Sequence, residues 1–159
     1  MNAPPFDKDK ANRWFAVELN NRSWDLLEKP ELTEAEADEV VHAAHASVYH
    51  WRQVGTVANH ARALCLLANV YAALRRGGEA IRYARQCVEL AEAHAGEIAD
   101  WDLAFGYDCL ARATAAAGDR EAAAKVRQQA RDYGDKIAEA EDKAVFDSWF
   151  ASGKWHGIG

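Results

Sequence analysis

Proline is confined to the first 30 of the 159 residues of this chain, at Pro4, Pro5 and Pro30. The rest of the chain therefore contains no residue whose ring would break a helix. The chain also contains 34 alanines, and alanine is the best helix former and a poor strand former. We therefore expect an all-α protein, and the length suits a single domain.

Charge and cysteine content exclude several classes of protein. A net charge of −6 argues against a general nucleic-acid binder, which would need a basic surface. No apolar run approaches the ~18 residues needed for a membrane span, so no membrane partner is expected. The three cysteines form no CxxC pair and fit reduced, packed thiols better than a disulfide framework or a zinc ribbon. We expect a cytoplasmic protein with no metal or other cofactor.

Apolar positions recur with a period of 43 residues, as at Ala37, Ala80 and Ala123. Three further series follow the same period: Trp24, Leu67 and Leu110; Leu27, Val70 and Ala113; and Ala44, Cys87 and Ala130. Each period is long enough for two helices. A repeat of this kind predicts an α-solenoid, in which hairpins stack because one hairpin cannot bury its apolar face alone.

Capping and turn signals divide each period into a helical hairpin. Thr33 and Glu36 form a capping-box pattern, and glycines interrupt the helical patterns between the later helices. The predicted helices span about residues 9–29, 34–54, 56–75, 78–95, 98–117, 119–138 and 140–151. We expect residues 1–8 to be a disordered lead, 9–138 to be three antiparallel hairpins, and 139–159 to be a capping helix and tail.

The second and third repeats resemble the tetratricopeptide repeat. Two matches carry the resemblance: Leu67-Ala68-x-x-Tyr71 followed by Ala80, and Leu110-Ala111-x-x-Thr114-x-x-x-Gly118 followed by Ala123. The resemblance covers most of residues 10–138, although the first repeat matches only through Trp24 and Ala37. Because the period exceeds the family's usual ~34 residues, the chain is most similar to long-repeat bacterial members of unassigned activity.

This resemblance implies a non-catalytic scaffold that binds a protein or peptide segment in a groove lined by the first helix of each hairpin. By register, the groove positions are Arg22, Leu26, Arg62, Cys65, Asn69, Phe105, Asp108 and Arg112. Asn69 matches the position where peptide-clamping members carry a backbone-binding asparagine. The arginines would supply forked donors to a carboxylate or phosphate. The alternative is that they are solvated or paired with acidic residues on neighbouring helices.

A polar stripe on the second predicted helix raises a second possibility. Its members, at helical spacing, are Asp38, His42, His45, Tyr49 and Arg52. Two imidazoles and a carboxylate are metal ligands, but one helix alone supplies them, so a metal site is not the favoured interpretation. We expect the stripe either to form an anion or small-molecule pocket with Asn59 and Arg62, conceivably of an enzyme, or to form a hydrogen-bonded interface between the first two hairpins, which is the favoured interpretation.

The C-terminal region is rich in aromatic residues, with Phe146, Trp149, Phe150 and Trp155. The last hairpin of a solenoid exposes an apolar side that must be covered. We therefore expect this region to fold back as a cap or to pair with a second copy in a homodimer.

Overall fold

In the computed structural model, which describes residues 4–157, this part of the chain forms seven α-helices and no strand. They are α1 (Lys8–Leu27), α2 (Glu34–Val54), α3 (Val57–Ala73), α4 (Gly77–Ala93), α5 (Asp100–Ala116), α6 (Arg120–Gly134) and α7 (Ala140–Ala151). The prediction of an all-α protein is confirmed. Of the predicted lead, residues 1–3 lie outside the described residues, and residues 4–7 are exposed and precede α1.

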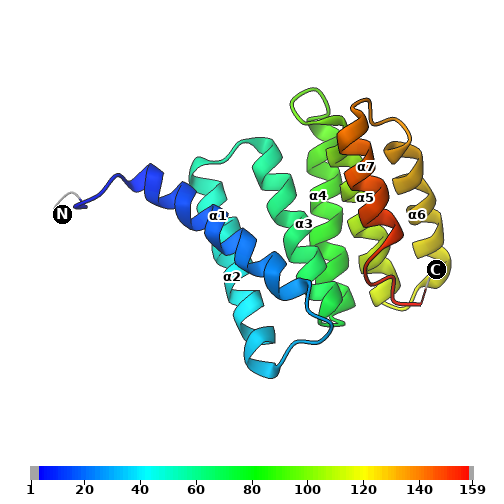
Figure 1. The fold of residues 1–159 in the computed structure, drawn as a ribbon, viewed down its shortest axis with the longest axis horizontal. Helices are drawn as coiled ribbons and strands as arrows, with labels where there is room; N and C mark the ends of the chain where they lie inside the picture. The colour runs from blue at the N-terminus through cyan, green and yellow to red at the C-terminus, as the bar shows by residue number, and fades with distance from the viewer. Residues whose placement is uncertain (1–3, 158–159) are drawn as a thin grey trace.

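The helices pack as three consecutive hairpins, α1–α2, α3–α4 and α5–α6 (Figure 1). The first helices of neighbouring hairpins also touch, α1 against α3 and α3 against α5. The short helix α7 packs on α5 and α6 at the C-terminal end. This arrangement confirms the predicted solenoid of three helical hairpins with a capping helix.

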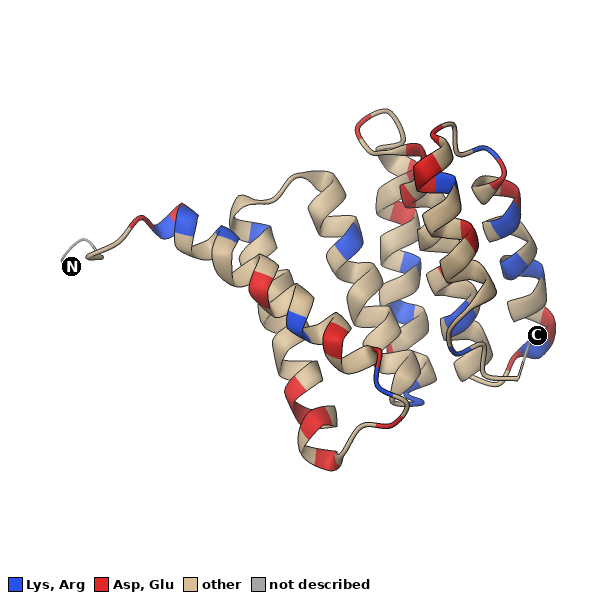
Figure 2. Ribbon diagram, viewed as in Figure 1, with Lys and Arg blue, Asp and Glu red and all other residues tan. Residues whose placement is uncertain are grey.

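The helix starts follow the capping chemistry of the sequence. Thr33 and Glu36 form the predicted capping box, with the Thr33 backbone N–H donating to Glu36 Oε2 at 3.0 Å. Acidic residues gather at the start of α2, where the positive end of the helix dipole favours them (Figure 2). The end of α1 at Leu27 precedes Pro30, as expected from the steric restriction that proline places on the residue before it.

Small side chains at the helix crossings allow the hairpins to close. Ala80 and Ala123 are fully buried, as are Ala44 and Ala130 from another repeat series. Ala37 is only half-buried, so the first hairpin is packed less closely at the equivalent point. The larger side chains of the repeat, such as Leu67 and Val70, fill the main core between the hairpins.

The predicted cap is formed by the aromatic face of α7. Phe146 is fully buried and meets the Phe105 ring edge-on, with ring centroids 5.2 Å apart. The helix α6 ends four residues before the predicted boundary, at Gly134, where the Phe146 ring occupies the space that a β-carbon would need. Because the cap uses these aromatic side chains within one chain, the homodimer through this region stays a prediction.

Replacing Gly134 by alanine tests how closely α7 is packed. We expect Gly134→Ala to lower the free energy of unfolding by about 1–3 kcal/mol, because the added methyl group collides with the Phe146 ring. Gly78→Ala is the matched control, since a β-carbon there meets nothing within 4 Å. The control should gain about 0.5–1 kcal/mol from helix propensity. Urea denaturation measures both, and equal effects would contradict the packing of α7 described here.

Candidate functional site

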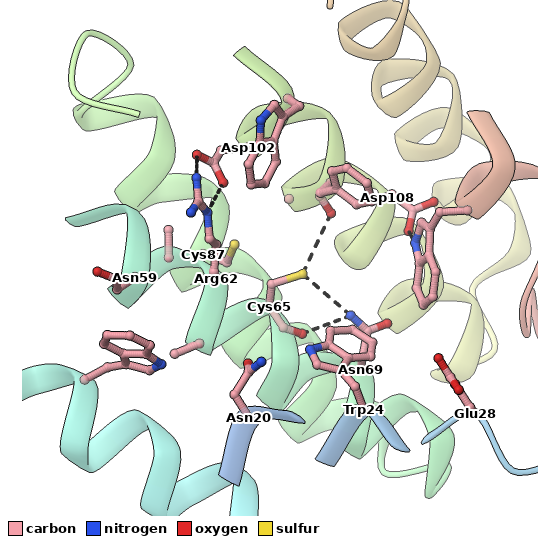
Figure 3. Close-up of a pocket in the computed structure, with 17 residues that line it drawn as sticks. Asn20, Trp24, Glu28, Asn59, Arg62, Cys65, Asn69, Cys87, Asp102 and Asp108 are labelled. Atoms are coloured by element: carbon pink, nitrogen blue, oxygen red, sulfur yellow. Dashed lines mark hydrogen bonds and ion pairs between the residues drawn. The ribbon is translucent and has the colours of Figure 1, made fainter. Parts of the chain in front are cut away.

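A cavity of about 510 Å³ lies among α1, α2, α3, α5 and α7, with one residue of α4 in its wall, and we call it the central pocket (Figure 3). Aromatic side chains from four of these helices line it: Trp24, Trp51, Trp101, Phe105 and Trp149. Its polar lining consists of Asn20, Glu28, Asn59, Arg62, Asn69, Asp102 and Asp108. The pocket therefore combines large flat apolar surfaces with a small number of polar groups, a composition typical of ligand sites.

Asn69 and Cys65 lie one helical turn apart on α3 and form one wall of the central pocket. The Asn69 Nδ2 group donates to the Cys65 carbonyl oxygen at 3.0 Å. The same nitrogen lies 3.6 Å from the sulfur atoms of both Cys65 and Cys109. Among residues 4–157, no donor bonds to Asn69 Oδ1, so this oxygen is the acceptor that the wall offers to a ligand.

A two-pronged ion pair joins α3 to α5 beside the pocket. Arg62 donates to the two carboxylate oxygens of Asp102, from Nε at 2.8 Å and from Nη2 at 2.9 Å. The Arg62 guanidinium also lies over the Trp101 ring, 4.2 Å from its centroid. Asp102 is buried and accepts the backbone N–H of Ala99 at 3.0 Å, which fixes it at the start of α5. The Arg62 side chain that lines the pocket is therefore already paired with a carboxylate of the same protein.

A second ion pair, between Asp108 and Arg112, is fully buried beneath α7. The Arg112 Nε donates to Asp108 Oδ2 at 2.8 Å, and the indole N–H of Trp149 donates to the same oxygen at 2.8 Å. Burial raises the pKa of Asp108, while the charge and hydrogen bonds of Arg112 and the hydrogen bond of Trp149 oppose that rise. The network ties the wall of the central pocket to the cap.

Arg112 uses its remaining donors within the chain. Its Nη2 donates to the carbonyl oxygens of Trp149 at 3.0 Å and Ser152 at 3.1 Å, at the C-terminal end of α7. Its guanidinium lies 4.0 Å from the centroid of the Trp155 ring. Arg112 is therefore a buried anchor for α7, which differs from the expected groove position.

Of the predicted groove residues, Arg62, Cys65, Asn69, Phe105 and Asp108 line the central pocket. Arg22 lies elsewhere, because its Nε donates to Glu39 on the exposed side of the first hairpin at 2.6 Å. This hydrogen bond is the main cause of the lowered pKa of Glu39. Leu26 is fully buried in the main core. For Arg22, the alternative given above therefore holds: this arginine pairs with an acidic residue on the neighbouring helix α2.

The polar stripe of α2 lies outside the central pocket. All five members are exposed: Asp38, His42, His45, Tyr49 and Arg52. His45 Nε2 lies 2.9 Å from the Tyr71 hydroxyl of α3, a contact between the first and second hairpins. Partial burial lowers the pKa of His45, and repulsion from the charge of His42 lowers it further by a smaller amount.

The two residues proposed to join the stripe, Asn59 and Arg62, both line the central pocket. Asn59 Oδ1 accepts the Thr56 backbone N–H at 3.0 Å. Sequence reasoning missed Asp102 and the lining role of three tryptophans, Trp51, Trp101 and Trp149. A signal for Asp102 existed, since it stands in the acidic first turn of α5, where a carboxylate accepts a free backbone N–H.

Loss of one charge should lower the stability of the protein far more at the buried Asp108–Arg112 pair than at the exposed Arg22–Glu39 pair. We expect Asp108→Asn to destabilise the protein by about 3–5 kcal/mol, because it leaves the buried Arg112 charge without a counter-ion. The matched control is Glu39→Gln, which removes the partner of Arg22 on the exposed surface and should leave stability unchanged within error. Urea titrations at neutral pH compare the two. A stable Asp108→Asn variant would contradict the anchoring role of the pair.

Comparisons with protein families, with curated proteins and with solved structures found nothing that matches this chain. Within residues 4–157, no helix has both the length and the apolar character that crossing a membrane requires. The described part of the chain also holds no cluster of three or more His, Cys, Asp or Glu side chains arranged to bind a metal ion. Any function assigned to the protein therefore rests on the geometry of its own residues.

Proposed function

We propose that the protein is a non-catalytic, tetratricopeptide-like scaffold that binds a segment of a partner protein or peptide in the central pocket. The observation that carries this proposal is the position of the pocket, which spans the first helices of all three hairpins and is lined by five aromatic side chains. Aromatic residues are enriched at protein interfaces, where they bury large areas with little loss of side-chain freedom.

The residues that line the pocket suit two parts of a bound segment differently: the aromatic rings suit an apolar side chain, and Asn69 suits the main chain. An apolar side chain of the partner fits among the indole rings, where its removal from water provides most of the binding free energy. The partner's main chain supplies N–H groups, and Asn69 Oδ1 is placed to accept one. Trp24 and Asn20 on α1 face this wall from the opposite side of the pocket (Figure 3).

The state of the charged groups favours binding over proton transfer. Of the three carboxylates that line the pocket, Asp102 and Asp108 are held by arginines and Glu28 is exposed to solvent, and none of the stripe histidines lines the pocket. A general acid or base needs a group that is free to exchange its proton near the reacting atoms. Ion-paired carboxylates instead fix the walls of the pocket.

The size of the pocket favours a second candidate, a small apolar molecule bound at the same place. About 510 Å³ falls within the range of about 300–1,000 Å³ that is common for small-molecule sites. This candidate uses the tryptophan-lined pocket in place of the α2 stripe, none of whose five residues lines the cavity.

A variant that fills the pocket tests the proposal. Asn20 lines the pocket, whereas the next residue, Asn21, is exposed and lies outside it. The two side chains share one hydrogen bond, 3.3 Å from Asn20 Nδ2 to Asn21 Oδ1, so replacing either one breaks the same contact. We expect Asn20→Trp to weaken peptide binding at least tenfold, or about 1.4 kcal/mol, and Asn21→Trp to leave it unchanged.

The ligands for this test are peptides selected from a random displayed library on the immobilised full chain, and calorimetry measures their affinity. Equal affinity in the two variants would place the binding surface outside the central pocket. If selection enriches no peptide while a small-molecule screen gives a ligand that Asn20→Trp excludes, the second candidate replaces the first.

A further inference from the structure

Three cysteines from three consecutive helices gather beside the central pocket, and two of them, Cys65 and Cys87, line it. Cys65 on α3 is half-buried, while Cys87 on α4 and Cys109 on α5 are buried. The Cys109 thiol lies 3.4 Å from the Cys65 carbonyl oxygen, and Asn69 Nδ2 lies 3.6 Å from the sulfurs of both Cys65 and Cys109. The close-up in Figure 3 places Cys65 in the middle of the pocket residues.

The repeat register separates Cys65 from the other two cysteines. Cys87 is in register with the buried alanines Ala44 and Ala130, so a small core residue is sufficient there. Cys109 falls in register with Leu66 and Ser23, which are also fully buried. Cys65 instead stands in the row of Arg22 and Asp108, where the other repeats carry charged side chains. Core packing therefore accounts for two of the thiols and leaves Cys65 unexplained.

The surroundings of the Cys65 sulfur favour its ionised form. The neighbouring Cys109 and Cys87 thiols lower the pKa of Cys65 and outweigh the opposing effect of burial. The pKa values of Cys87 and Cys109 are themselves raised. The amide N–H of Asn69 points at the Cys65 sulfur, 3.6 Å away, and donates to it. Cys65 is therefore the thiol of the three that is best placed to react as a thiolate.

We propose that Cys65 is a covalent modification site, which exchanges with small disulfides that enter the central pocket. The Cys65 thiolate attacks one sulfur of the disulfide, a new bond forms between that sulfur and Sγ, and the original sulfur–sulfur bond breaks. The leaving thiolate takes a proton from water, which balances the proton that Cys65 had released. The Cys65 sulfur is oxidised and the departing half of the disulfide is reduced, so no other oxidant is needed.

The pocket provides room for the group that stays attached to Cys65. Its volume is about 510 Å³, and Cys65 and Cys87 are the two cysteines that line it. Arg62 uses Nε and Nη2 for Asp102, which leaves Nη1 for an acidic adduct. The inference requires only that the pocket admits a small molecule, so it does not depend on the proposed peptide ligand.

The test uses the reduced full chain and oxidised glutathione, followed by intact mass measurement and peptide mapping. We expect one adduct, located at Cys65, and none on Cys65→Ser. Cys87→Ala and Cys109→Ala should each still form the adduct at Cys65, but more slowly, because each removes one thiol that stabilises the thiolate. Adducts at Cys87 or Cys109 of the native protein, or no adduct while the urea-unfolded chain reacts at all three cysteines, would overturn the proposal.

The pH dependence separates an activated thiol from one that is merely accessible. Asn69→Leu removes the N–H donor, so we expect its exchange to be slower than that of the unaltered chain below neutral pH, by up to about tenfold for each unit that the thiol pKa rises. The two rates should converge at alkaline pH, where both thiols are ionised. Thermal melts confirm that each variant is folded. Equal rates at all pH values, or an internal disulfide formed in place of the adduct, would contradict the inference.

Discussion

The buried network of Asp108, Arg112 and Trp149 is the interaction on which the C-terminal half of the molecule depends. An isolated charge in this position would be costly, and the structure supports it with a counter-ion, an indole donor and several carbonyl acceptors. The Arg112 guanidinium donates to the Ser152 carbonyl oxygen just after α7, and it adds a second donor to the Trp149 carbonyl oxygen, which also accepts the Ser152 backbone N–H. The cap, one wall of the pocket and the last hairpin are therefore held by a single group of charges.

The central pocket is a consequence of how unevenly the hairpins pack. Small residues such as Ala80 and Ala123 bring the helices of the second and third hairpins together. The Arg62–Asp102 pair then fixes the distance between α3 and α5, with Trp101 stacked below the guanidinium. With α1 on one side and Trp149 of α7 on the other, the remaining space is enclosed by aromatic rings. Both ion pairs neutralise the two aspartates of the walls, which leaves the interior between the aromatic rings suited to an apolar group.

Periodicity predicted the fold well because helix packing repeats along the chain. The bounds of α2 and α7 agree with the expected ranges, and the series at Ala80 and Ala123 lies in the core. The register predicted Arg112 as a groove residue, but it does not encode which partners a long side chain reaches. It therefore did not predict that Arg112 pairs with Asp108, one turn away, and is covered by α7. Trp24 was visible as a repeat position and Trp149 as part of the aromatic C-terminal region, while their convergence on one pocket depends on how the helices are oriented in space.

The anchor of α7 also bears on how freely the end of the chain can change over evolution. Arg112 contacts Trp149, Ser152 and Lys154 through their carbonyl oxygens, which every amino acid possesses. As far as this anchor is concerned, the side chains of Ser152 and Lys154 are open to substitution. Gly153 is the exception, because its φ is +80° and a β-carbon there would lie 2.6 Å from Arg112 Nη1. Divergent sequences that share this cap would therefore be recognised by an Asp and an Arg four residues apart, together with a distant Trp and Gly, while the residues between them vary.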